Sequence, residues 1–174
     1  MRIAGFVEES IVDGPGFRIV IFFQGCAHHC YGCHNPETWD FEGGKEVSFD
    51  LIKKIIDDNP YADGITLSGG DPLYQIDAST EIAEYAKSKG LDVILYTGFL
   101  FEEVLEMTKA NQRLKDLLNN VDTLIDGPFI LEQRHLSLKF RGSSNQRILN
   151  VPESLEQKKA VWESRESWVG ERRF

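Results

Sequence analysis

The chain has 174 residues, with 19 Lys and Arg against 28 Asp and Glu, which gives a formal net charge of −9. This length predicts one domain with its own hydrophobic core. Hydrophobic residues make up 41% and charged residues 27%, values that exclude disordered and fibrous classes. The negative charge argues against general nucleic-acid binding, which requires Lys and Arg to neutralise phosphates.

Neither a membrane segment nor a secretion signal is expected. The longest fully apolar run, Ile19–Phe23, is far shorter than the ~20 residues that a transmembrane helix needs. Residues Met1–Val12 lack the apolar core of a signal peptide. We therefore expect a cytoplasmic protein with no membrane partner.

Strand and helix signals alternate along the chain. The β-branched and aromatic stretch Phe17–Phe23 predicts a strand buried on both faces, and Ser48 is a candidate N-cap for a helix ending at Asp58. The later elements expected in chain order are a strand at Gly64–Leu67, a helix at about Asp77–Lys89, a strand at Leu91–Tyr96, helices from Phe101 and after Asn111, strands at Val121–Ile125 and Arg147–Val151, and a helical stretch from Glu153. This alternation predicts an α/β fold with a mainly parallel sheet, either open or curled into a partial barrel.

Unusual loops follow four of the predicted strands. They are the cysteine-containing loop after the first strand, then Ser68–Pro72, Thr97–Gly98 and Asp126–Pro128. The carboxyl ends of parallel strands meet at one edge of a sheet, and α/β proteins bind their ligands there. The sequence therefore predicts one active rim built from these loops.

All three cysteines of the chain, Cys26, Cys30 and Cys33, lie in the first of these loops. An odd, clustered set is a poor disulfide framework, whereas thiolates are the preferred ligands of zinc and of iron–sulfur clusters. Three thiolates can hold a cubane cluster and leave its fourth iron open to a substrate or cofactor. The alternative is structural zinc completed by one of His28, His29 or His34. The cluster is favoured, because structural zinc usually draws its ligands from two separated pairs.

Two other segments allow both a functional and a plain structural interpretation. Gly69 and Gly70 would let the backbone approach a ligand closely, and Asp71 could accept a hydrogen bond from a ligand amine, but many such sequences are simple turns. The polar segment Arg141–Arg147 is equally compatible with a binding loop and a solvated loop. Arg134, His135 and Lys139 make this region basic, as a docking surface for an acidic partner segment would be.

The Cys-x3-Cys-x2-Cys spacing resembles that of the radical S-adenosylmethionine superfamily. More narrowly, the chain is similar to the activating proteins of anaerobic ribonucleoside-triphosphate reductase over about Val12–Val151. The segments that carry this resemblance are Asp13–Gly16, Gly25–Asn35, Thr38–Trp39, Ser68–Leu73, Tyr96–Gly98, Ile125–Phe129 and Arg141–Gln146. We expect residues 1–174 to be a single domain with a partial (βα) barrel core at 12–151 and a tail of unknown role at 152–174.

The resemblance also implies a set of site residues. Cys26, Cys30 and Cys33 would bind a 4Fe-4S cluster, and no catalytic residue is expected beyond the cluster and its cofactor. The cofactor S-adenosylmethionine would contact Gly32, Cys33, His34, Ser68, Gly69, Gly70, Asp71 and Thr97. Two of these positions depart from the superfamily pattern. Gly32 stands where many members have an aromatic residue, and Asp71 stands where most have Glu.

The resemblance further implies an activating enzyme (EC 1.97.1.-). It would cleave S-adenosylmethionine reductively to give a 5′-deoxyadenosyl radical, which makes a glycyl radical on the large subunit of the anaerobic reductase. A flavodoxin or ferredoxin would supply the electron. The alternatives are another glycyl-radical activase, another small radical S-adenosylmethionine enzyme, or a zinc-binding interaction module.

Overall fold

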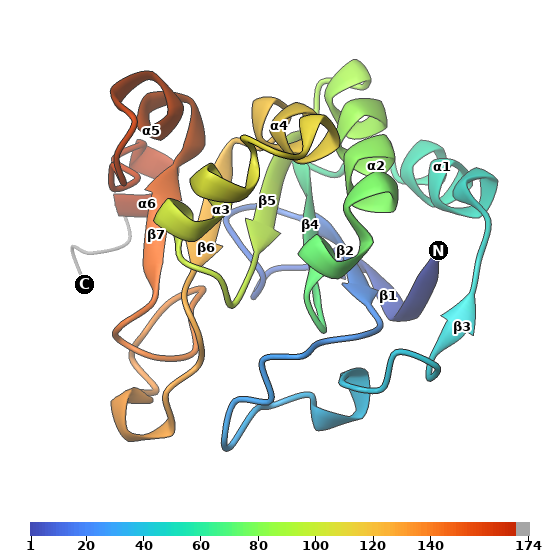
Figure 1. Cartoon of the computed structure of the whole chain (residues 1–174). Helices are drawn as coiled ribbons and strands as arrows, with labels where there is room; N and C mark the ends of the chain where they lie inside the picture. The colour runs from blue at the N-terminus through green and yellow to red at the C-terminus, as the bar shows by residue number, and fades with distance from the viewer. Residues whose placement is uncertain (170–174) are drawn as a thin grey trace.

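A computed structural model describes residues 1–169 of the chain and shows a sheet flanked by helices (Figure 1). Seven strands pair in the order β3-β1-β2-β4-β5-β6-β7. The four central strands run parallel: β2 (Arg18–Phe23), β4 (Gly64–Gly69), β5 (Asp92–Tyr96) and β6 (Thr123–Asp126). The flanking strands pair antiparallel: β1 (Arg2–Ser10), β3 (Lys45–Glu46) and β7 (Arg147–Asn150). Because β3 and β7 are the two edges, the sheet stays open, which is compatible with a partial barrel.

Helices cover one face of this sheet, as Figure 1 shows for α1 to α4. The helices are α1 (Phe49–Asp58), α2 (Ile76–Ser88), α3 (Phe101–Met107), α4 (Gln112–Asn119), α5 (Val151–Gln157) and α6 (Glu166–Val169), with short 3-10 turns at Pro36–Thr38, Pro72–Gln75 and Leu131–Gln133. Apolar side chains of α1, α2 and α4 pack against those of the central strands to form the main core. As predicted, Ser48 caps α1 by accepting a hydrogen bond from the backbone of Leu51.

The other face of the sheet carries a buried arginine that fixes the segment before β2. The Arg18 Nε donates to the Thr66 hydroxyl (2.8 Å), and its Nη2 lies 3.1 Å from an Asp92 carboxylate oxygen. Burial lowers the pKa of Arg18, and the ion pair with Asp92 opposes that effect. Its Nη1 also donates to the Pro15 carbonyl, and Thr66 donates to the Asp13 carbonyl. The Asp13–Gly16 turn is thereby held against the sheet.

The predicted central elements and the edge strand β7 are confirmed within a few residues of their ends, but β1 and β3 at the other side of the sheet were not predicted. β1 was not predicted, since Gly5 and the Glu8–Glu9 pair interrupt its apolar pattern. α5 begins at Val151, slightly before the expected helical stretch, and residues 170–174 of the tail lie outside the described part of the chain. Among residues 1–169, no helix is long and apolar enough to cross a membrane.

Candidate cluster and cofactor site

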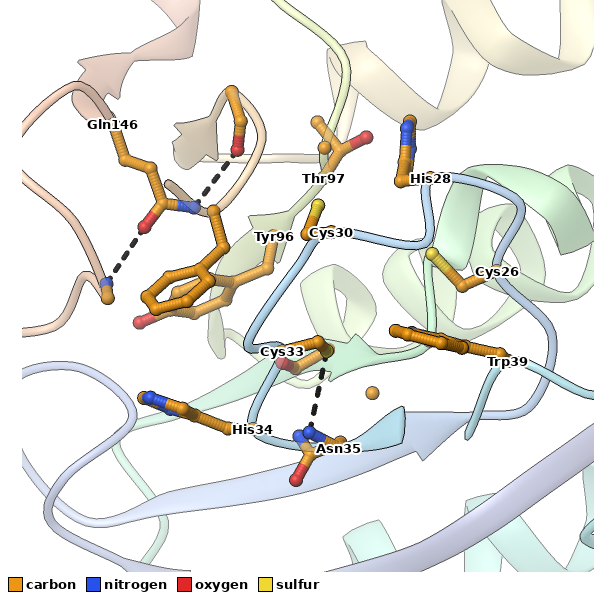
Figure 2. A pocket seen from close by; sticks show the side chains of 17 residues that line it. Cys26, His28, Cys30, Cys33, His34, Asn35, Trp39, Tyr96, Thr97 and Gln146 are labelled. Carbon is orange, nitrogen blue, oxygen red and sulfur yellow. Dashed lines mark hydrogen bonds between the residues drawn. The ribbon is translucent and has the colours of Figure 1, made fainter. Parts of the chain in front are cut away.

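The loops at the carboxyl ends of the parallel strands surround one open cavity (Figure 2). The space between its walls, counted out to the open mouth, is about 780 Å³. Its walls come from the cysteine loop (residues 25–35) with Trp39, from the ends of β4 and β5, and from the segment between β6 and β7. These loops lie on the lower side of the sheet in Figure 1. The prediction of a single rim at the strand ends is confirmed.

All three thiols line this cavity (Figure 2), and none forms a disulfide. The Cys33 Sγ accepts a hydrogen bond from the Asn35 backbone N–H at 3.5 Å. Burial raises the pKa of the Cys26 thiol to about 11, an effect that the His28 backbone N–H opposes. An iron ion at Cys26 would have to displace the thiol proton, since the thiolate is the metal ligand.

This set of donors fits an iron–sulfur cluster. Cysteine thiolates are the usual ligands of such clusters, and each binds a different iron, so the three sulfurs need not converge on one point. In residues 1–169, no three His, Cys, Asp or Glu side chains gather around a position for a single metal ion. His28, one candidate for a fourth zinc ligand, has its Nε2 atom 2.7 Å from the Asp71 carboxylate.

The cysteine loop is anchored to the segment that follows it. The Gly25 N–H donates to the Thr38 carbonyl (2.8 Å), and the Cys26 N–H donates to the Trp39 carbonyl (3.2 Å). The buried Gln24 side chain donates to two more carbonyls of the same segment, those of Glu37 and Asp40. These bonds fix the base of the loop to the segment 37–40.

The paired glycines Gly69 and Gly70 are required by close backbone packing. Gly69 has a φ of +102°, and a Cβ there would lie 2.3 Å from the Phe23 nitrogen. A Cβ on Gly70 would lie 2.4 Å from the Gly25 carbonyl oxygen. The Gly70 N–H also donates to the Phe23 carbonyl at 2.8 Å. The loop after β4 therefore lies directly against the end of β2 and the base of the cysteine loop, with its glycine backbone exposed to the cavity.

Most residues predicted to contact the cofactor are brought together here, but two are not. Those that line the cavity are Cys33, His34, Ser68, Gly69, Gly70 and Thr97. Gly32 lies outside it, packed beside Leu131. Asp71 lies behind the wall, 1% exposed, where its carboxylate accepts hydrogen bonds from other parts of the chain. The role of all eight residues toward a cofactor stays a prediction.

Several wall residues were not predicted as site residues. Tyr96, Trp39, Phe129 and Gln146 all line the cavity. Burial raises the pKa of Tyr96, whose hydroxyl donates to the Phe140 carbonyl. The sequence contains one indication of this position for Tyr96. It is the last residue of a predicted strand and directly precedes the Thr97–Gly98 loop of the predicted rim.

The segment before β7 closes one side of the cavity through Gln146. Its Oε1 accepts hydrogen bonds from the backbone N–H groups of Gly142 (2.8 Å) and Ser143 (3.1 Å), and its Nε2 donates to the Gly127 carbonyl (3.0 Å). Figure 2 draws two of the hydrogen bonds of the Gln146 side chain as dashed lines. Gln146 thus ties the loop after β6 to the Arg141–Arg147 segment.

Comparison with known proteins gives a consistent result. Residues 12–149 match the family model described as a 4Fe-4S single cluster domain. The anaerobic ribonucleoside-triphosphate reductase-activating protein of Salmonella typhimurium is 35% identical over 154 residues, covering 84% of this chain and 96% of that protein. The chain belongs to this family of activating proteins. The family member from Escherichia coli K12 is 35% identical over 149 residues, covering 81% of this chain and 93% of its own length.

A match over a shorter stretch is to an activating enzyme with a different printed name. The pyruvate formate-lyase-activating enzyme of Clostridium pasteurianum is 40% identical over 116 residues, which cover 62% of this chain and 49% of that enzyme. Residues 12–149 of this chain, which match the iron–sulfur family model, include all three cysteines and every other residue that lines the cavity.

Proposed function

We propose that this activating protein is a radical S-adenosylmethionine enzyme that generates the glycyl radical on anaerobic ribonucleoside-triphosphate reductase. The observation that carries the proposal is the meeting of Cys26, Cys30 and Cys33 with the Gly69–Gly70 backbone in one cavity at the strand ends. The names of the family members and the iron–sulfur family model support it.

In this proposal the thiolates of Cys26, Cys30 and Cys33 would hold a 4Fe-4S cluster with one iron left open for S-adenosylmethionine. When bound and reduced, such a cluster would supply the electron for reductive cleavage of S-adenosylmethionine to methionine and a 5′-deoxyadenosyl radical, the species that would take a hydrogen atom from one glycine of the reductase. The electron would come from a low-potential donor such as flavodoxin or ferredoxin. The chain itself would bind and orient the cluster and the cofactor, and would exclude water from them.

Named residues can perform these tasks. The Asn35 N–H that bonds to Cys33 would remain on a thiolate ligand, and hydrogen bonds to cluster sulfurs help to set the reduction potential. Trp39, Tyr96 and Phe129 supply aromatic walls that limit water around the cavity. Gly69 and Gly70 line the cavity without a side chain, so a ligand could approach their backbone closely. None of these roles requires a side-chain acid or base.

A second target is favoured by one observation, the identity to the pyruvate formate-lyase-activating enzyme. That similarity covers only 62% of this chain, whereas the reductase-activating proteins match 81–84% of it. The reductase is therefore the better-supported target.

The cofactor chemistry is tested by anaerobic reconstitution of the purified protein with iron and sulfide. We expect about four irons and four sulfides per chain, and release of 5′-deoxyadenosine and methionine when reductant and S-adenosylmethionine are added. A colourless protein that holds stoichiometric zinc and no acid-labile sulfide would contradict the proposal and favour a zinc-binding module.

Replacing Gln146 with Ala is expected to weaken S-adenosylmethionine binding by about 3–10-fold, which corresponds to the net contribution of a single hydrogen bond. The reason is that Gly142, Ser143 and Gly127 would lose the side chain that holds this wall of the cavity. Equilibrium titration of the reconstituted protein measures the change. Iron content should stay at the wild-type level, and a variant with lower iron but unchanged affinity would show that Gln146 supports the cysteine loop instead.

A further inference from the structure

One buried carboxylate joins the cysteine loop to the ends of two strands. The Asp71 Oδ2 atom lies 2.7 Å from His28 Nε2 and accepts hydrogen bonds from the Thr97 hydroxyl (2.8 Å) and the Gly98 N–H (2.9 Å). Its Oδ1 accepts from the Leu73 N–H at 2.9 Å. Four donors from three segments therefore converge on a side chain that is 1% exposed and does not line the cavity.

His28 is the contribution of the cysteine loop to this group, and its ring is closely packed. The ring lies edge-on to Phe99, with centroids 4.5 Å apart, and 5.8 Å from the ring of Tyr74. A Cβ on Gly98 would come within 2.5 Å of the imidazole, so only glycine leaves room for the ring at its present place. Because a carboxylate has no hydrogen to donate, the hydrogen of the short contact belongs to His28 Nε2.

On the basis of the proposed function, we propose that His28 and Asp71 are a positioning pair that holds the cysteine loop against the ends of β4 and β5. Asp71 then serves the cofactor site through the shape of the loop, without contact with the amino group of S-adenosylmethionine. This assigns the acidic residue after the paired glycines a role different from the direct contact expected from the sequence.

The physical consequence is a loop whose thiols are held in place before the cluster is bound. His28 lies midway between Cys26 and Cys30 in the sequence, so its bond to Asp71 restrains the backbone that carries both. Removing either partner leaves buried polar groups unsatisfied and releases that restraint. A looser loop should let a bound cluster escape faster, because release requires the thiolates to move apart.

Two substitutions of His28 separate its two contacts. His28→Phe keeps an aromatic ring against Phe99 and Gly98 but removes the donor to Asp71, whereas His28→Gln keeps an N–H donor of similar reach without the ring. Asp71→Asn is nearly the same size as the native side chain, yet its amide presents an N–H group to at least one of the four donors. His29→Asn is the control: His29 is the neighbouring exposed residue with a φ of 47°, which Asn tolerates, and it does not line the cavity.

The first measurement uses the metal-free protein, so its result does not depend on whether the proposed chemistry is right. Amide hydrogen exchange over residues 26–33 should be about 10-fold faster in His28→Phe and in Asp71→Asn, and close to wild type in His28→Gln and His29→Asn. Unchanged exchange in His28→Phe would overturn the proposal. If Asp71→Asn does not fold, the comparison of His28→Phe with His28→Gln still decides the test.

The second measurement is the rate at which an iron chelator removes the reconstituted cluster. His28→Phe and Asp71→Asn should each lose the cluster about 10-fold faster than wild type. The double variant His28→Phe/Asp71→Asn should lose it no faster than either single variant, because each single substitution already removes the same interaction. Additive effects would contradict a pair. A fall in S-adenosylmethionine affinity confined to Asp71→Asn, with normal cluster retention, would instead show direct contact with the cofactor.

Discussion

A Cys30→Ser variant is expected to lose cleavage of S-adenosylmethionine by more than about 100-fold. Substitution of residues that merely support a metal ligand costs about 10–100-fold, and Cys30 would be a ligand itself. Its thiol lines the cavity with those of Cys26 and Cys33, and no other cysteine exists in the chain to replace it. The measurement is 5′-deoxyadenosine formed per reconstituted chain, together with the iron and sulfide contents.

The control for this variant is His29→Asn, one residue away in the same loop and outside the cavity wall. It should retain the wild-type cluster content and cleavage rate. If Cys30→Ser cleaved S-adenosylmethionine at a rate within a few-fold of wild type, Cys30 would not be a cluster ligand. Another part of the chain would then have to supply the third ligand.

A Gly70→Ala variant is expected to lose about 1–3 kcal/mol of unfolding free energy and most of its capacity to hold a cluster. The added Cβ would meet two backbone carbonyl oxygens, that of Gly25 at 2.4 Å and that of Thr38 at 3.0 Å. Backbone atoms cannot turn aside as a side chain can, so the base of the cysteine loop must shift. Thermal unfolding of the metal-free protein and iron content after reconstitution measure the two effects.

Gly5→Ala provides a matched change from glycine to alanine. An added Cβ on Gly5 meets nothing within 4 Å, so its melting temperature and iron content should stay close to wild type. If Gly70→Ala behaved in the same way, the close approach of the β4 loop to the cysteine loop would not be a requirement of the site.

The central fold could be predicted because local sequence determines it. After Arg18, β2 is continuously apolar, and it lies between β1 and β4. Ser48 and Asn111 cap their helices through their own side chains. β1 could not be predicted in this way, because its outward side chains are mostly exposed and its pairing with β2 is not encoded in a local apolar pattern. The position of the rim followed from the order of parallel strands alone.

The details of the site depend on contacts between distant parts of the chain. The His28–Asp71 contact joins residues 43 positions apart, and nothing in either local sequence indicates the other. The sequence predicts a basic docking surface around the Arg141–Arg147 segment. Within this segment, Arg147 forms ion pairs with Asp126 and Glu102, so the charge of Arg147 is used inside the protein. Docking of a partner by the remaining basic residues of that segment stays a prediction.

In the proposed function, this chain places a radical on a glycine of the anaerobic reductase. Electron paramagnetic resonance of the large reductase subunit, recorded after incubation with the reduced, reconstituted protein and S-adenosylmethionine, tests this proposal. We predict a glycyl doublet that appears with the wild-type protein and is absent with Cys30→Ser. Complete cleavage of S-adenosylmethionine without a doublet on the reductase would contradict the claim and point to a different substrate.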